Sequence, residues 1–306
     1  MNPALRSEQK PLSLLQVWWL AIRPRTLPAS MAGVAAGVAC AVLAGQVRAV
    51  QSLVALAIAL LLQIGSNLAN DVFDHERGAD AARAFGPTRV TESGLLRPAQ
   101  VKTGMIVVFA LAALLGLFLA TTVGWVVVPV GALAILCAIA YTGGPYPLGY
   151  HGLGELFVLL FFGFASVGGT AYVNLSWVPP SAWALSLPLG LLIVGILVVN
   201  NLRDIDADRL ADKRTLAVRF GERFSKAEYT TCLAVSFLAL PIFCAAGILH
   251  WWAMLAWLTL PLAWRNVHQI HSVKGTPLNA VLAGTGQLAL FYGLAVLVGS
   301  LISTLL

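Results

Sequence analysis

Apolar segments long enough to cross a lipid bilayer recur along the whole of this chain of 306 residues. A helix that spans the hydrocarbon core needs about 20 mainly apolar residues. Charged residues make up only 10% of the sequence, whereas soluble domains contain about 25%. The sequence therefore predicts an all-α, polytopic membrane protein. This prediction replaces the two soluble domains that length alone would suggest.

We expect nine membrane-spanning helices in one bundle, which forms a single domain over residues 1–306. A weak internal repeat supports this organisation: Asn67 and Asp71 end the second helix with the same spacing that Asn200 and Asp204 have at the end of the sixth. Helices 1–4 would then correspond to helices 5–8, with helix 9 added. The helices are predicted at residues 26–45, 50–70, 103–121, 123–141, 153–173, 183–201, 227–248, 250–268 and 279–302.

The basic residues indicate how the bundle is oriented. If the N-terminus is cytoplasmic and each helix crosses once, 18 of the 19 lysine and arginine residues fall on the cytoplasmic side, and only Arg48 falls outside. Such an excess is typical of cytoplasmic loops, so we predict a cytoplasmic N-terminus and an external C-terminus. The net charge of +6 then reflects topology and attraction to anionic lipid, and it gives no reason to expect nucleic-acid binding. Trp18 and Trp19 fit a short amphipathic segment at the cytoplasmic interface.

Most of the thirteen acidic residues gather in two clusters at the cytoplasmic ends of the second and sixth helices. Residues three or four apart share a helix face, so each cluster presents amides from the last membrane turn and carboxylates just beyond it. Carboxylates near hydrocarbon are functional candidates, and Mg²⁺ prefers carboxylates together with substrate phosphates. The first cluster comprises Asn67, Asn70, Asp71 and Asp74, and the second comprises Asn200, Asn201, Asp204 and Asp208.

Other interpretations of these clusters remain open at this point. Each could be a solvated helix end that forms salt bridges, and Arg203 and Arg209 are expected to pair with neighbouring acids in any case. The clusters could also belong to a cation-coupled transporter, although a carrier more often places ionisable groups near the middle of the membrane. No role follows from the sequence for Asp80, Asp206 or Asp212.

Four motifs give the chain a resemblance to a known family. They are RPRTLPAS at residues 23–30, SNLANDVFD at 66–74, YTGGPYPLGYHGLGE at 141–155 and NNLRDIDADRLADKRTLAVRFG at 200–221. Together they resemble the UbiA superfamily of intramembrane prenyltransferases over nearly the whole chain. The last motif is the most specific, and it resembles the menaquinone branch, whose acceptor is 1,4-dihydroxy-2-naphthoate.

The resemblance implies an enzyme of a bacterial cytoplasmic membrane with its active site on the cytoplasmic side. It would transfer a polyprenyl group from a prenyl diphosphate to 1,4-dihydroxy-2-naphthoate, with loss of CO₂ and diphosphate, to give demethylmenaquinol. The aromatic acid could instead be 4-hydroxybenzoate or homogentisate. In this reading Mg²⁺ neutralises the leaving diphosphate.

The resemblance also implies roles for the site residues. Asp71, Asp74, Asp204 and Asp208 would hold Mg²⁺, and Asn67, Asn70, Asn200 and Asn201 would bind the metal–diphosphate group. Lys213 and Arg25 are candidates for direct phosphate contact, although Arg25 could equally anchor the helix at the interface. Tyr141 could stabilise an allylic cation with its ring face or belong to an interfacial belt of aromatic residues. Glu155 could orient the acceptor or take its proton.

Overall fold

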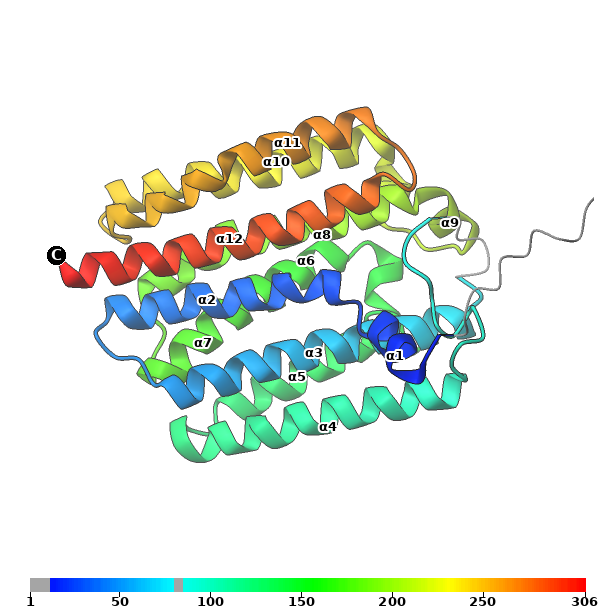
Figure 1. The fold of residues 1–306 in the computed structure, drawn as a ribbon, viewed down its shortest axis with the longest axis horizontal. Coiled ribbons are helices and arrows are strands. Elements are labelled where there is room, and N and C mark those ends of the chain that lie inside the picture. Colours follow the sequence, from blue (N-terminus) through cyan, green and yellow to red (C-terminus); the bar gives the residue numbers. More distant parts are fainter. Residues whose placement is uncertain (1–11, 80–84) are drawn as a thin grey trace, which may run out of the picture.

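The computed structural model describes residues 12–79 and 85–306, and within these ranges the chain contains helices and connecting segments but no β-strand. The long helices run nearly parallel to one another and lie side by side (Figure 1). Their bounds are α1 Leu14–Ile22, α2 Leu27–Leu43, α3 Ala49–Glu76, α4 Pro98–Val123, α5 Val127–Ala140, α6 Gly154–Val158, α7 Ser166–Leu175, α8 Pro180–Arg203, α9 Ile205–Leu210, α10 Leu216–Ala245, α11 Leu260–Ser272 and α12 Leu278–Leu305. Short 3-10 segments lie at Pro24–Thr26, Leu148–His151 and Trp251–Thr259, and a π-helical turn joins α6 to α7 at Leu159–Ala165.

The all-helical, multi-span prediction is confirmed. Seven helical segments in the described part of the chain are long and apolar enough to cross a membrane. Each of the nine predicted segments coincides with helix, but three are less regular than expected. Residues 153–173 contain the short helix α6, the π-helical turn and the first part of α7. Residues 123–141 contain the 14-residue helix α5, and residues 250–268 combine a 3-10 segment with the first part of α11. The number of crossings therefore stays a prediction.

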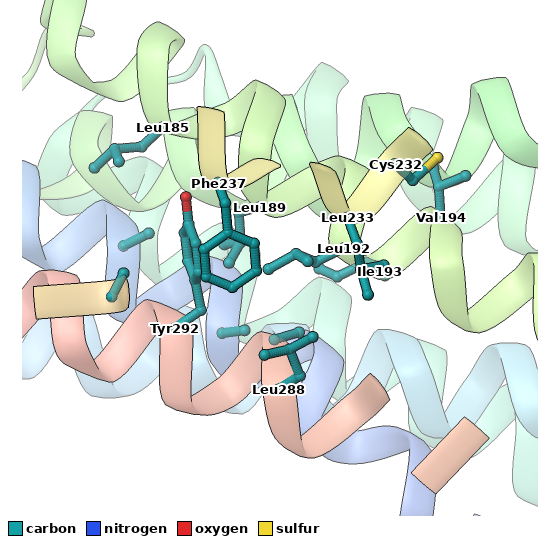
Figure 2. Close-up of a cluster of buried hydrophobic side chains, with 14 of the residues drawn as sticks. Leu185, Leu189, Leu192, Ile193, Val194, Cys232, Leu233, Phe237, Leu288 and Tyr292 are labelled. Carbon is teal, nitrogen blue, oxygen red and sulfur yellow. The ribbon is translucent and has the colours of Figure 1, made fainter. Parts of the chain in front are cut away.

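The largest hydrophobic core lies where α8, α10 and α12 pack together with α2. Figure 2 shows its leucine and isoleucine side chains on α8 interleaved with those of the neighbouring helices. Phe237 on α10 meets Tyr292 on α12 edge to face, with ring centroids 5.5 Å apart. The Tyr292 hydroxyl donates to the backbone oxygen of Ser236 at 2.7 Å, so this buried polar group is satisfied within the core.

Small residues allow the central helices to approach closely. A side chain added at Gly33 on α2 would lie 2.2 Å from Ser166 Oγ on α7, and one added at Gly37 would lie 2.4 Å from Thr170 Cβ. Close packing of this kind holds helices together where lipid removes the hydrophobic driving force between them. It fixes α2 in the centre of the bundle, between α7 and α12.

One end of the bundle carries α1, α9 and the ends of α3 and α8 that hold the two acid clusters, and we call it the acidic end. The C-terminus lies at the opposite end (Figure 1). The predicted amphipathic segment is α1, whose Val17 and Ala21 are buried. Trp19 remains exposed on the outer face of this helix. The acidic end is therefore assembled from segments that are far apart in the sequence.

Candidate active site

Asp71 and Asp74 lie in the last turns of α3, which continues to Glu76, beyond the predicted end at residue 70. Asp71 is 1% exposed and accepts hydrogen bonds from the backbone N–H groups of Val90 and Thr91 at 3.3 and 3.0 Å. The Arg23 guanidinium lies 3.4 Å from the same carboxylate. Asp71 thus connects α3 to the chain before α4 and to the end of α1.

Asp74 has different partners on its two oxygens. Arg89 Nη2 donates to Asp74 Oδ2 at 3.0 Å, and the Tyr150 hydroxyl donates to Asp74 Oδ1 at 2.9 Å. Both bonds are shielded from water, because the Arg89 side chain is 9% exposed and that of Asp74 4%. Charge-assisted bonds in such surroundings hold a side chain firmly, so Asp74 is fixed by residues 15 and 76 positions away in the sequence.

The second cluster does not lie on one continuous helix face as predicted. Helix α8 ends at Arg203, Asp204 is its C-terminal cap, and α9 begins at Ile205. Both oxygens of Asp204 accept from the Arg203 guanidinium, at 2.8 and 2.7 Å, while Lys213 Nζ lies 3.5 Å from Asp208. The pairing predicted for Arg203 is confirmed, as is that of Arg209, which contacts exposed Asp206 at 3.2 Å.

A cavity of about 20 Å³ separates the two clusters. Carboxylates from α3 and from the α8–α9 junction face it together with two cationic side chains, so the two clusters do meet at the acidic end. Its lining is formed by Asp74, Ala79, Arg89, Asn200, Asp204, Ala207, Asp208 and Lys213.

The donor set suits Mg²⁺ and a phosphate group together. Three carboxylates and the side-chain amide of Asn200 supply oxygen ligands of the kind that Mg²⁺ prefers. Arg89 and Lys213 supply positive charge for phosphate oxygens. Within residues 12–79 and 85–306, no three His, Cys, Asp or Glu side chains form a ready-made metal cage. Mg²⁺ usually binds through one or two carboxylates plus substrate phosphates, so this arrangement fits a metal that arrives with its substrate.

The connection between α5 and α6 contributes Tyr150, which contacts Asp74 and lies beside Lys213, two of the residues that line the cavity. The cations of Arg77 and Lys213 lie 5.4 and 5.3 Å from the centroid of the Tyr150 ring. The Tyr150 backbone oxygen accepts from Arg214 N–H at 2.8 Å. Burial and the Asp74 carboxylate raise the pKa of the Tyr150 phenol, which therefore stays a neutral donor. Tyr150 connects both clusters.

Tyr141 and Glu155 flank this connection. A side chain added at Gly154 would lie 2.7 Å from Tyr141 Oη, so the tyrosine packs directly against the start of α6. Glu155 Oε1 accepts from Asn201 Nδ2 at 3.0 Å. Asn201 therefore points to Glu155, while Asn200, its neighbour in the sequence, faces the cavity.

Three other predicted residues lie away from the cavity. Asn67 donates to the Ile22 backbone oxygen at 2.8 Å and to Thr26 Oγ1 at 3.0 Å, so it holds the chain between α1 and α2. Asn70 accepts from Thr142 Oγ1 at 3.0 Å. Arg25 is exposed.

Sequence reasoning missed Arg23, Arg89 and Tyr150, although Arg23 and Tyr150 lie within the motifs at residues 23–30 and 141–155. Among the acids with no assigned role, Asp206 and Asp212 are exposed, with side chains 87% and 83% accessible. Asp80 lies outside the described residues.

The architecture is that of UbiA-type membrane proteins. The chain shares its fold with a UbiA homologue from Aeropyrum pernix K1, with a TM-score of 0.67 and 16% identity over 91% of this chain and 98% of the other. A UbiA homologue from Archaeoglobus fulgidus, solved with GPP and Mg²⁺ bound, has a TM-score of 0.65 and 14% identity over 92% and 99% of the two chains.

Sequence comparison identifies the family. The chain belongs to the UbiA prenyltransferase family, whose profile matches residues 30–278, and the resemblance seen in the motifs is confirmed. It is 40% identical to the 1,4-dihydroxy-2-naphthoate octaprenyltransferase of Mycobacterium tuberculosis over 287 residues, which cover 91% of this chain and 94% of the relative. It is 37% identical to the Escherichia coli protein of the same name over 83% of this chain and 84% of the relative.

Proposed function

We propose that this protein transfers a polyprenyl group from a prenyl diphosphate to 1,4-dihydroxy-2-naphthoate, releasing CO₂ and diphosphate and producing demethylmenaquinol. The observation that carries the proposal is the meeting of two acid clusters and two cations around one cavity at the end of an apolar bundle. An apolar bundle accommodates a polyprenyl tail, whereas the charges that line the cavity complement its Mg²⁺-bound diphosphate. The names of the relatives support the choice of acceptor.

Asp74, Asp204 and Asp208 are the proposed Mg²⁺ ligands that line the cavity. Asp71 remains a proposed ligand as well, but it now accepts hydrogen bonds from Val90 and Thr91, so binding a metal would require exchange of these contacts. When bound, Mg²⁺ supplies Lewis-acid neutralisation of the diphosphate. This role accords with the Mg²⁺ in the structure of the Archaeoglobus homologue.

Arg89 and Lys213 are proposed to contact the diphosphate oxygens, together with Asn200. The allylic C–O bond breaks with its electron pair moving to the diphosphate, and fixed positive charges stabilise the negative charge that develops there. The surrounding apolar helices keep water from the allylic cation. Arg25 remains a proposed outer phosphate contact, but it is exposed and lies away from the cavity.

Tyr141 and Glu155 are proposed to serve the acceptor side of the reaction. The neutral Tyr141 ring can face the allylic cation, and Glu155, held by Asn201 at 3.0 Å, can accept a hydrogen bond from a ring hydroxyl. The ring carbon that carries the carboxylate attacks the cation. Loss of CO₂ returns the bonding electron pair to the ring, so no external base or oxidant is needed.

We further propose that the chain forms one domain with nine crossings in a bacterial cytoplasmic membrane, with its acidic end at the cytoplasm. The position of the C-terminus at the opposite end (Figure 1) supports an odd number of crossings. The correspondence of helices 1–4 with helices 5–8 remains part of this proposal, supported by the placement of both acid clusters at one end.

The test is an assay of purified protein with Mg²⁺, a long polyprenyl diphosphate and a panel of aromatic acids that includes 4-hydroxybenzoate and homogentisate. We expect 1,4-dihydroxy-2-naphthoate labelled at its carboxyl group to release labelled CO₂ in step with prenylation. Consumption of another acid would overturn the acceptor assignment, and a prenylated product that keeps the carboxyl group would overturn the decarboxylation. Reversible loss of activity on chelation is expected if Mg²⁺ is required.

A further inference from the structure

A groove that the proposed reaction does not use lies between α1 and the first turns of α4. Its volume is about 520 Å³, far larger than the cavity between the acid clusters. It is open to the side of the bundle at the acidic end. The groove is lined by Trp18, Arg97, Ala99, Gln100, Thr103, Gly104 and Val107.

The groove forms where Trp18 of α1 packs against Gly104 of α4. A side chain added at Gly104 would lie 2.8 Å from the Trp18 ring, so only a glycine allows this ring to rest on α4. Val17 and Ala21 fix α1 by inserting into the core formed with α3 and α4. Trp18 therefore forms one wall of the groove, and the surface of α4 forms another.

The two ends of the groove differ in polarity. Arg97 occupies the N-cap position of α4, where the partial positive charge of the helix adds to that of the side chain. Further along α4 the groove reaches Val107, which is 51% exposed, and its neighbour Ile106 is 62% exposed. Both side chains belong to the apolar surface of α4, which is long and apolar enough to span the membrane. A cationic end that leads into an apolar surface complements an amphiphile with a negative headgroup.

We propose that this groove binds a membrane phospholipid with an anionic headgroup. The headgroup phosphate pairs with Arg97, and the acyl chain follows Gly104 and Val107 along α4. Tryptophan side chains prefer the depth at which headgroup and acyl chain meet, and basic pockets at the cytoplasmic side of membrane proteins attract anionic lipid. The exposed side chain of Trp19 places α1 at the same depth.

Binding of lipid to the purified, full-length protein tests the proposal. Native mass spectrometry measures the affinity for phosphatidylglycerol and, with identical acyl chains, for phosphatidylcholine. We expect tighter binding of phosphatidylglycerol, and an affinity about five-fold weaker in Arg97→Gln, the effect of one basic residue at a membrane surface. Arg223→Gln is the matched control, because Arg223 is also exposed but does not line the groove.

A second variant separates volume from charge. Thr103 is exposed on α4, so Thr103→Trp fills the groove without entering the core, and it should reduce phosphatidylglycerol binding while the melting temperature stays near that of the wild type. Equal affinity for the two lipids, equal losses in Arg97→Gln and Arg223→Gln, or unchanged binding in a folded Thr103→Trp would each overturn the proposal. Displacement of phosphatidylglycerol by farnesyl diphosphate in equal amounts would also overturn it, since the groove would then be a docking site for substrate.

Discussion

Tyr150→Phe isolates one hydrogen bond of the active site. The substitution removes the hydroxyl that donates to Asp74 Oδ1 at 2.9 Å and keeps the ring beside Arg77 and Lys213. A hydrogen bond to a charged group contributes about 1.5–3 kcal/mol. If the whole of this free energy serves to position Asp74 toward the metal–diphosphate group, kcat/KM for the prenyl diphosphate should fall about 10- to 150-fold.

The assay is steady-state prenylation with the diphosphate, Mg²⁺ and the acceptor varied in turn. We expect the Mg²⁺ concentration for half-maximal rate to rise, while KM for the acceptor stays the same, because Tyr150 contacts Asp74 and not the acceptor side. Tyr146→Phe is the matched control: Tyr146 lies in the same connection but is 57% exposed and stacks on His151. An unchanged kcat/KM in Tyr150→Phe, or an equal loss in Tyr146→Phe, would refute the reasoning.

Three further outcomes are expected. Asp204→Asn should lower kcat by about 100-fold or more, as loss of one group that stabilises transition-state charge does in other enzymes. Asp206→Asn should retain the wild-type rate, because the Asp206 side chain is 87% exposed. Equal rates for the two variants would argue against the proposed metal site. Reporter fusions after Arg223 should give cytoplasmic signals and fusions at Leu306 external ones, and a cytoplasmic C-terminus would contradict the odd number of crossings. Because the folded-state pKa of Tyr150 is raised from its ordinary value of 10.0, its contribution to stability is complete below that pH and declines as pH rises above it. The melting temperature should therefore fall more steeply above pH 10 in the wild type than in Tyr150→Phe, and parallel curves would show that Tyr150 does not titrate differently on unfolding.

The acidic end shows why part of the site could be predicted and part could not. Asp71 and Asp74 share a helix face, and Asp204 and Asp208 are still joined by an i to i+4 backbone hydrogen bond of 2.8 Å across the α8–α9 junction. Local spacing therefore identified the carboxylates. Arg89 and Tyr150 reach Asp74 from connections without regular periodicity, and no spacing in the sequence relates them to it.

The amides illustrate the same limit. Helical periodicity grouped Asn200 and Asn201 with the acids, but the two are adjacent and point about 100° apart around a helix. Only packing against α6 decides that Asn201 contacts Glu155 while Asn200 faces the cavity. Similarly, both Arg23 and Arg25 precede α2, but the left-handed backbone of Arg23, with φ of 55°, ends α1 where its side chain meets Asp71.

The sequence by itself determined the class of the protein, the approximate positions of its long helices and the two acid clusters. These depend on hydropathy and on helical periodicity, which act over neighbouring residues and are written directly in the order of the amino acids. The tertiary structure alone decided which cations pair with which carboxylates, that Tyr150 contacts Asp74, and that a groove opens beside Trp18. These features depend on contacts between segments tens of residues apart, and only the close packing of the helices brings such segments together.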